Sequence, residues 1–180
     1  MVGAWAIGRQ FGPSAPASKH SSTATTPGFS AYRDPGGLFA GSYPSGWQRI
    51  APANDASVVL LAQSGNGASL LVRKTTVSAQ VSVANLASAQ RLTDSVVHSD
   101  KSVQLLRPPQ QVTLSGLPGY LYLYTFKDPS TGVQGAHAHY FLFDGATMVT
   151  LVFQAVPPNS ILTQAPLFDR IAKTFHPISG

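Results

Sequence analysis

The sequence has no cysteine and no glutamate, and it carries few charges of either sign. Without cysteine there is no disulfide, no thiol nucleophile, no cysteine-ligated zinc and no lipid-modified cysteine. Because glutamate is missing, any catalytic carboxylate must come from aspartate. Charged residues make up only 11% of the 180 residues, whereas average soluble domains have roughly 25%. A globule that is poor in charge and rich in Ser, Thr, Gly and Pro is more typical of the cell exterior than of the cytosol.

Structural roles explain the positions of all seven aspartates. Asp34 and Asp128 precede proline and Asp144 precedes glycine, which are turn positions. The remaining aspartates lie in a loop or on or beside predicted helices. No two are visibly paired to separate their pKa values, as acid–base catalysis requires. No Gly-x-Ser-x-Gly elbow surrounds any serine. We therefore predict a protein that is not an enzyme and uses no cofactor.

The net charge of +5 would favour anionic surfaces such as lipid headgroups. The basic residues are scattered, however, and Arg73-Lys74 is the only adjacent pair. Nucleic-acid binding calls for basic residues interleaved with exposed aromatics. Here the aromatics follow the alternation of strands, which is more often a core signature. We expect no nucleic-acid partner.

The N-terminal part divides into two segments before the globule begins. Residues 1–11 are apolar, but they are too short for the roughly 20 residues that span a bilayer. They also lack a basic start and a cleavage site, so they are interpreted either as the end of a membrane anchor or signal segment or as a disordered tail. Residues 12–28 are rich in Ser, Thr, Ala and Pro, which predicts a flexible stalk. The globule is expected at 29–177, followed by a short tail at 178–180.

The stretch Tyr32–Trp47 is predicted to form an antiparallel hairpin. Its turn, residues 34–37, reads Asp-Pro-Gly-Gly, in which proline presets φ and glycine tolerates positive φ. Phe39, Tyr43 and Trp47 are large apolar bodies whose burial would anchor the hairpin to a core.

The rest of the globule alternates between strand and helix periods. Tyr120–Phe126 is the clearest strand, with apolar groups on both faces, which suggests a central strand. Amphipathic spacing predicts a helix over 83–99, with Ser82 as N-cap, and a closing helix around 165–175, with Pro166 near its first turn. The other predicted strands are 57–63, 68–77, 103–107, 111–115, 135–143 and 147–155, the first two joined by an Asn-Gly turn and the last two by Asp144-Gly145. This order predicts an α+β domain with a mostly antiparallel sheet.

The sequence resembles PsbP-like domains. The resemblance rests on Asp34, Gly36, Gly37 and the Phe-x-x-x-Tyr-Pro-x-Gly-Trp pattern at 39–47, and it continues in the Gly119-Tyr120 strand and the 167–175 helix. It implies an α/β/α sandwich with a central antiparallel sheet. The founding members are extrinsic lumenal subunits of photosystem II, and similar domains occur in bacterial envelope lipoproteins and in a nuclear Ran-binding factor. Members act mainly by binding, so the resemblance implies a binding role here.

Two groups of residues are candidates for a site. His137 and His139 share one face of a strand, so both imidazoles could reach one metal if a third ligand such as His98, Asp128 or Asp144 converged. The alternative is that the pair sits partly exposed at a strand start. Tyr120, Tyr122 and Tyr124 could line an apolar ligand pocket, although a helix packed on that face is the commoner explanation.

Together these features predict a non-enzymatic, extracytoplasmic binding domain, membrane-anchored or secreted, with a possible N-terminal tether. Its partner is expected to be a protein or a cell-envelope component. The alternative is a small-ligand or metal-binding domain that uses the sheet face near His137 and His139.

Overall fold

The computed structural model describes residues 28–51 and 55–178. The predicted anchor remnant (1–11), all but the last residue of the predicted stalk (12–28) and the end of the tail lie outside the described residues. The strands are β1 (Phe29–Arg33), β2 (Phe39–Pro44), β3 (Gln48–Arg49), β4 (Val58–Gln63), β5 (Ala68–Val81), β6 (Gln104–Leu105), β7 (Gln110–Leu114), β8 (Leu117–Lys127), β9 (Gln134–Ala155) and β10 (His176–Pro177). The helices are α1 (Leu86–Val97) and α2 (Ile161–Thr174), each preceded by a short 3-10 turn, η2 (Val83–Asn85) and η3 (Pro158–Ser160).

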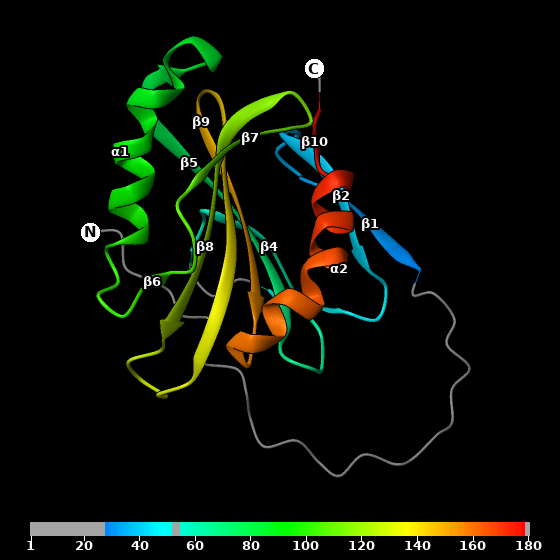
Figure 1. Ribbon diagram of the computed structural model, residues 1–180. Coiled ribbons are helices and arrows are strands. Elements are labelled where there is room, and N and C mark those ends of the chain that lie inside the picture. The colour runs from blue at the N-terminus through cyan, green and yellow to red at the C-terminus, as the bar shows by residue number, and fades with distance from the viewer. Residues whose placement is uncertain (1–27, 52–54, 179–180) are drawn as a thin grey trace, which may run out of the picture.

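The elements form three layers, as Figure 1 shows. The central layer is a sheet in the order β3-β4-β5-β9-β8-β6, with β7 also paired to β8. Helix α1 covers one face, and α2 covers the other together with a small sheet in the order β1-β2-β10. Every strand pairing in the described residues is antiparallel. The predicted α+β class and α/β/α sandwich are confirmed.

The predicted hairpin at 32–47 is present as β1 paired with β2. The Asp34 carboxylate accepts a hydrogen bond from the Leu38 backbone N–H at 3.1 Å, which holds the turn. Phe39 and Trp47 are buried, and Tyr43 is half-buried against the same core. Tyr32 adds an anchor that the sequence did not reveal, because its hydroxyl donates to the Val59 carbonyl at 2.6 Å.

Strand β9 folds back on itself. Its first half pairs with β8 and its second half pairs with β5. The side chains of His137 and Gln154, 17 positions apart, meet at 3.1 Å, which a straight strand rising about 3.3 Å per residue would forbid. The reversal lies at Gly145, which has a φ of 57°; the turn of β9 is at the top of the sheet in Figure 1. The predicted 135–143 and 147–155 hairpin is therefore confirmed.

The helical segment begins after Ser82, as predicted, but its first three residues form the 3-10 turn η2, and α1 itself begins at Leu86 with Asn85 as its N-cap. The Asn85 side chain accepts a hydrogen bond from the Ser82 backbone N–H at 2.7 Å. The buried side of α1 is Leu86, Ala89, Thr93 and Val97. On this side the helix buries Thr93 and leaves the neighbouring Leu92 exposed.

Helix α2 differs from the expectation at Pro166. The helix begins at Ile161, so the proline lies in the second turn rather than near the first. Proline has no N–H to donate to the carbonyl four residues earlier, which belongs to Leu162. Leu162 is among the most exposed apolar residues of the structure, so water can satisfy that carbonyl.

Gly119 offers a test of the packing between β8 and β9. A Cβ built at this position would overlap the Phe141 carbonyl of the paired strand, and backbone cannot move aside without breaking the ladder. We expect Gly119→Ala to lower the free energy of unfolding, measured in urea, by about 3 kcal/mol. The matched control is Gly46→Ala, since nothing lies within 4 Å of that position. Equal stability of the two variants would contradict the close strand approach.

Candidate functional site

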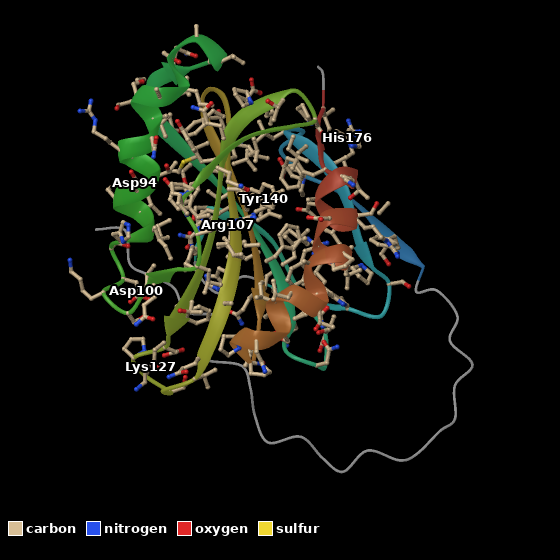
Figure 2. The ribbon with its side chains drawn as sticks, in the orientation of Figure 1. Asp94, Asp100, Arg107, Lys127, Tyr140 and His176 are labelled. Atoms are coloured by element: carbon tan, nitrogen blue, oxygen red, sulfur yellow. The ribbon has the colours of Figure 1, made fainter. Side chains whose placement is uncertain are left out.

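A cavity of about 330 Å³ lies between the sheet and the C-terminal end of α1. Its apolar wall includes Leu71, Val96, Val97, Val103, Met148 and Val152. Its polar wall includes Arg73, Asp100, Tyr124, His137, His139 and Thr150. Figure 2 shows Asp94 on α1 and Asp100 in the loop just after the helix. The volume falls at the lower end of ordinary ligand pockets.

The cavity exists because α1 is shorter than the strand it covers. Twelve helical residues rise about 18 Å, whereas the eleven residues of β8 extend about 36 Å. The helix is hydrogen-bonded to Tyr120 and Tyr122 but not to Tyr124. Tyr124 and Phe126 line the cavity together with Val96 and Val97 at the end of α1.

The first two tyrosines of the row are tied to α1. Tyr120 donates to the Leu86 carbonyl at 3.3 Å. Tyr122 donates to the Asp94 carboxylate at 2.6 Å and lies 2.7 Å from the Thr93 hydroxyl. Burial, and next the Asp94 carboxylate, raises the pKa of Tyr122. These contacts make Tyr120 and Tyr122 part of the helix–sheet interface, so only Tyr124 of the three predicted ligand-binding tyrosines lines the cavity.

Tyr124 joins the two histidines. Its hydroxyl lies 3.0 Å from Nδ1 of His139 and 3.2 Å from Nδ1 of His137. His137 continues the chain through Nε2, which lies 3.1 Å from Oε1 of Gln154. At the other end, Nε2 of His139 is buried and has no hydrogen-bond partner. The result is a chain of four side chains with one free end.

Both imidazoles are buried rather than partly exposed. His137 is 7% exposed and stacks on Phe126, with ring centroids 4.2 Å apart. His139 is 8% exposed and stacks on Phe141 at 3.9 Å. The alternation along β9 placed the pair on one face as expected, but that face is covered by the α1 layer.

Burial keeps both histidines neutral at pH 7. Desolvation lowers the pKa of His137 to about 4, against an ordinary value of 6.5. It lowers the pKa of His139 well below 6.5, and the nearby His137 and Arg73 lower it further. Desolvation also raises the pKa of the Tyr124 phenol, so this group keeps its proton.

Arg73 and Asp100 are the charged groups in the cavity wall. The Arg73 guanidinium pairs with Asp55 at 3.1 Å, with the two side chains 20% and 24% exposed. Hydrogen bonds from Ser57 lower the pKa of Asp55, so the carboxylate stays ionised. The Nε of Arg73 is buried and has no partner. Asp55 thus largely neutralises the charge of Arg73, while the Nε–H group of Arg73 remains available to donate a hydrogen bond.

The predicted metal site gains no third ligand. Within 28–51 and 55–178, no three His, Cys, Asp or Glu side chains cluster in a way that could hold a metal ion. Three of the four ring nitrogens of His137 and His139 already have protein partners. A metal on this pair would have to displace Tyr124 or Gln154, and metal binding stays a prediction without support from this geometry.

Sequence reasoning missed Gln154 and Arg73. Gln154 interrupts the apolar run Leu-Val-Phe-Gln-Ala-Val at 151–156, and a polar residue inside a buried strand is a signal for a buried partner. Arg73 is likewise a polar residue that interrupts the strand-like segment 68–77. Neither pattern identifies the residue that Gln154 or Arg73 contacts, because the contact depends on which strands are neighbours in the sheet.

No protein-family model matches the sequence, and no curated protein matches it. Solved structures do match. LpqN, described as involved in cell envelope biogenesis of Mycobacterium tuberculosis, superimposes with a TM-score of 0.60 at 12% identity, over 86% of this chain and 93% of that chain. The cyanobacterial PsbP (CyanoP) of Synechocystis gives 0.56 at 15% identity, over 91% and 99%.

The Saccharomyces cerevisiae Ran-binding protein Mog1p gives a TM-score of 0.54 at 13% identity, over 86% of this chain and 97% of that chain. The chain spans about half of a further structure, from Bacteroides thetaiotaomicron, with 48% of that chain covered at a TM-score of 0.57 and 11% identity. The architecture described above is an α+β sandwich with a cavity under one helix. More narrowly, it is the PsbP-like fold, which Mog1p shares.

The lowered pKa values predict a loss of stability in mild acid. In the unfolded chain His137 binds a proton below about pH 6.5, whereas in the folded protein it does so only below about 4. The free energy of unfolding therefore holds the full contribution of His137 above pH 6.5. It decreases as the pH falls toward 4, by about 3 kcal/mol for this residue alone. Asp55 and Asp128, whose folded pKa values are lowered, lose their contributions only below 3.8.

Urea unfolding between pH 7.5 and 4.5 measures this effect. His137→Gln should flatten the profile, and the exposed His176→Gln should leave it unchanged. A wild-type stability that is constant from pH 7 to 5 would contradict the burial of neutral imidazoles.

Proposed function

We propose that the chain is a non-enzymatic binding domain that takes up a small, mostly apolar component of the cell envelope in the cavity beneath α1. The observation that carries this proposal is the cavity itself: largely apolar walls with a few converging polar groups are the usual construction of a ligand site. Envelope chemistry is suggested by the shared fold with LpqN, whose description names cell envelope biogenesis.

The polar groups of the cavity favour binding over catalysis. Among the residues that the structure describes, Asp100 is the only carboxylate in the cavity wall, so they offer no carboxylate pair to divide acid and base roles. In the described part of the chain, no serine or threonine hydroxyl is hydrogen-bonded to an imidazole, as an activated nucleophile would be. The two buried imidazoles are instead occupied by Tyr124 and Gln154.

A second candidate is a protein partner bound at the edge of the main sheet. Leu105 and Leu106 are 37% and 50% exposed, and Leu105 belongs to the short edge strand β6. An edge strand with exposed apolar side chains can accept a further strand from another chain.

The location we propose is outside the cytoplasm, with residues 1–11 as a membrane tether and 12–28 as the stalk. The composition of these segments supports the proposal. Among the described residues, α1 and α2 are both too short and too polar to act as a membrane-spanning helix.

Blocking the cavity tests the proposed ligand. The purified chain is incubated with an organic-solvent extract of the envelope of its own organism, and retained molecules are identified by native mass spectrometry. Val96→Trp fills the cavity wall with a bulky side chain and should abolish retention. Val83→Trp is the matched control, because Val83 is 75% exposed and lies outside the cavity. Retention of nothing by the wild type, or equal retention by both variants, would overturn the proposal.

Fractionation tests the location. The full chain produced in its own organism should appear with the membranes and be degraded by protease added to intact cells. Deletion of residues 1–11 should release it from the membrane fraction. A product that stays in the cytosol and is protected from the protease would show that the extracytoplasmic assignment is wrong.

A further inference from the structure

The free end of the buried hydrogen-bond chain points to the kind of ligand that the cavity takes. His139 lines the cavity, the residue is only 8% exposed, and its Nε2 has no hydrogen-bond partner in the described part of the protein. An unpartnered buried polar atom is rare in folded proteins, because it has lost its water without gaining a replacement. The proton arrangement along the chain decides whether this atom donates or accepts.

The direction of the chain follows from its far end. Oε1 of Gln154 can only accept, so Nε2 of His137 carries the proton. A neutral His137 then has a lone pair on Nδ1, which accepts the single O–H of Tyr124. The Tyr124 oxygen in turn accepts from Nδ1–H of His139. His139 is therefore left with a lone pair on Nε2, an acceptor at the cavity wall.

We propose that Nε2 of His139 accepts a hydrogen bond from a hydroxyl group of the ligand, and that this ligand is an uncharged, mostly apolar alcohol or phenol. The inference rests on the proposed function, since it assumes that the cavity holds a ligand. It adds which chemical group is recognised and which atom recognises it.

Arg73 supports a hydroxyl rather than a simple N–H donor. Arg73 lines the same cavity, and its buried Nε–H lacks an acceptor in the protein. A hydroxyl offers a proton for His139 and lone pairs that suit an N–H donor such as Arg73. An anionic ligand is disfavoured, because the Arg73 charge is already paired with Asp55, while Asp100 and the His139 lone pair would repel a carboxylate.

A matched pair of probes isolates the hydrogen bond. 2-Naphthol carries the hydroxyl, and 2-methoxynaphthalene has the same ring body and oxygen but no proton to donate. Satisfying a buried acceptor should make naphthol bind at least about tenfold more tightly to the full chain at pH 7. 2-Naphthoate, an anion of the same body, should bind more weakly than naphthol. Titration followed by fluorescence or calorimetry measures all three affinities.

Two variants separate recognition from folding. His139→Phe keeps a ring that can stack on Phe141 but removes the acceptor, so naphthol and its methyl ether should bind equally. Tyr124→Phe keeps His139 but removes the acceptor of its Nδ1–H, so the preference should fall. His176→Phe is the control: this residue is exposed and lies well away from Asp94 and Asp100 in Figure 2, so the variant should leave the preference unchanged.

Two-bond proton–nitrogen NMR spectra add a readout that needs no ligand. Wild-type His139 should carry its proton on Nδ1, and His137 should carry it on Nε2. A proton on Nε2 of His139 would overturn the inference, whatever the binding data show.

The outcomes distinguish this inference from the proposed function. If the naphthalene probes and envelope molecules all fail to bind, the cavity is not a ligand site and both fail. If naphthol and the ether bind wild type equally, the cavity binds ligands but His139 does not select a hydroxyl. Tighter binding of naphthoate, or a naphthol preference that survives in folded His139→Phe, also overturns the inference. A preference lost in that variant and kept in His176→Phe supports it.

Discussion

The need to satisfy three buried tyrosine hydroxyls organises one whole face of the sheet. A tyrosine ring gains by burial, but its hydroxyl must then find a partner in the protein. Tyr120 finds the backbone of α1, Tyr122 finds two side chains of α1, and Tyr124 finds the histidine pair. The first two partners fix the helix over the strand. The third partner lies on β9 rather than on the helix, and the polar chain and the cavity occur together at the end of α1.

The periodicities of the sequence were sufficient to predict an α+β domain with a mostly antiparallel sheet, whereas the three layers were implied by the resemblance to PsbP-like domains. Alternation put Tyr120, Tyr122 and Tyr124 on one face of β8, and spacing every three or four residues marked α1. The Asn-Gly and Asp-Gly turns marked both hairpins. Local chemistry explains this success, because turn residues and side-chain alternation act over a few positions.

The site could be predicted only in part, because its contacts join residues far apart in the chain. His137 and His139 were recognisable as a pair on one face, but their burial depends on α1, which lies about 40 residues earlier. Gln154 reaches His137 only because β9 reverses at Gly145. Tyr124 looked like one of three equivalent tyrosines, and only the length of α1 makes it different. Local patterns carry no information about where a helix ends relative to the strand beneath it.

The pairing of β5 with β9 has a consequence for how the chain is made. Residues 68–81 pair with β4 along one edge, but they find their second partner only at 145–155, so most of the globule must be synthesised before the central sheet can close. Until then one edge of β5 is open, and the second half of the domain does not yet cover its apolar residues Leu70 and Val72. Such long-range pairing slows folding, and unpaired edges favour aggregation. The nascent domain would thus benefit from being kept apart from its copies, by a chaperone or by slow delivery, until its last hundred residues have emerged.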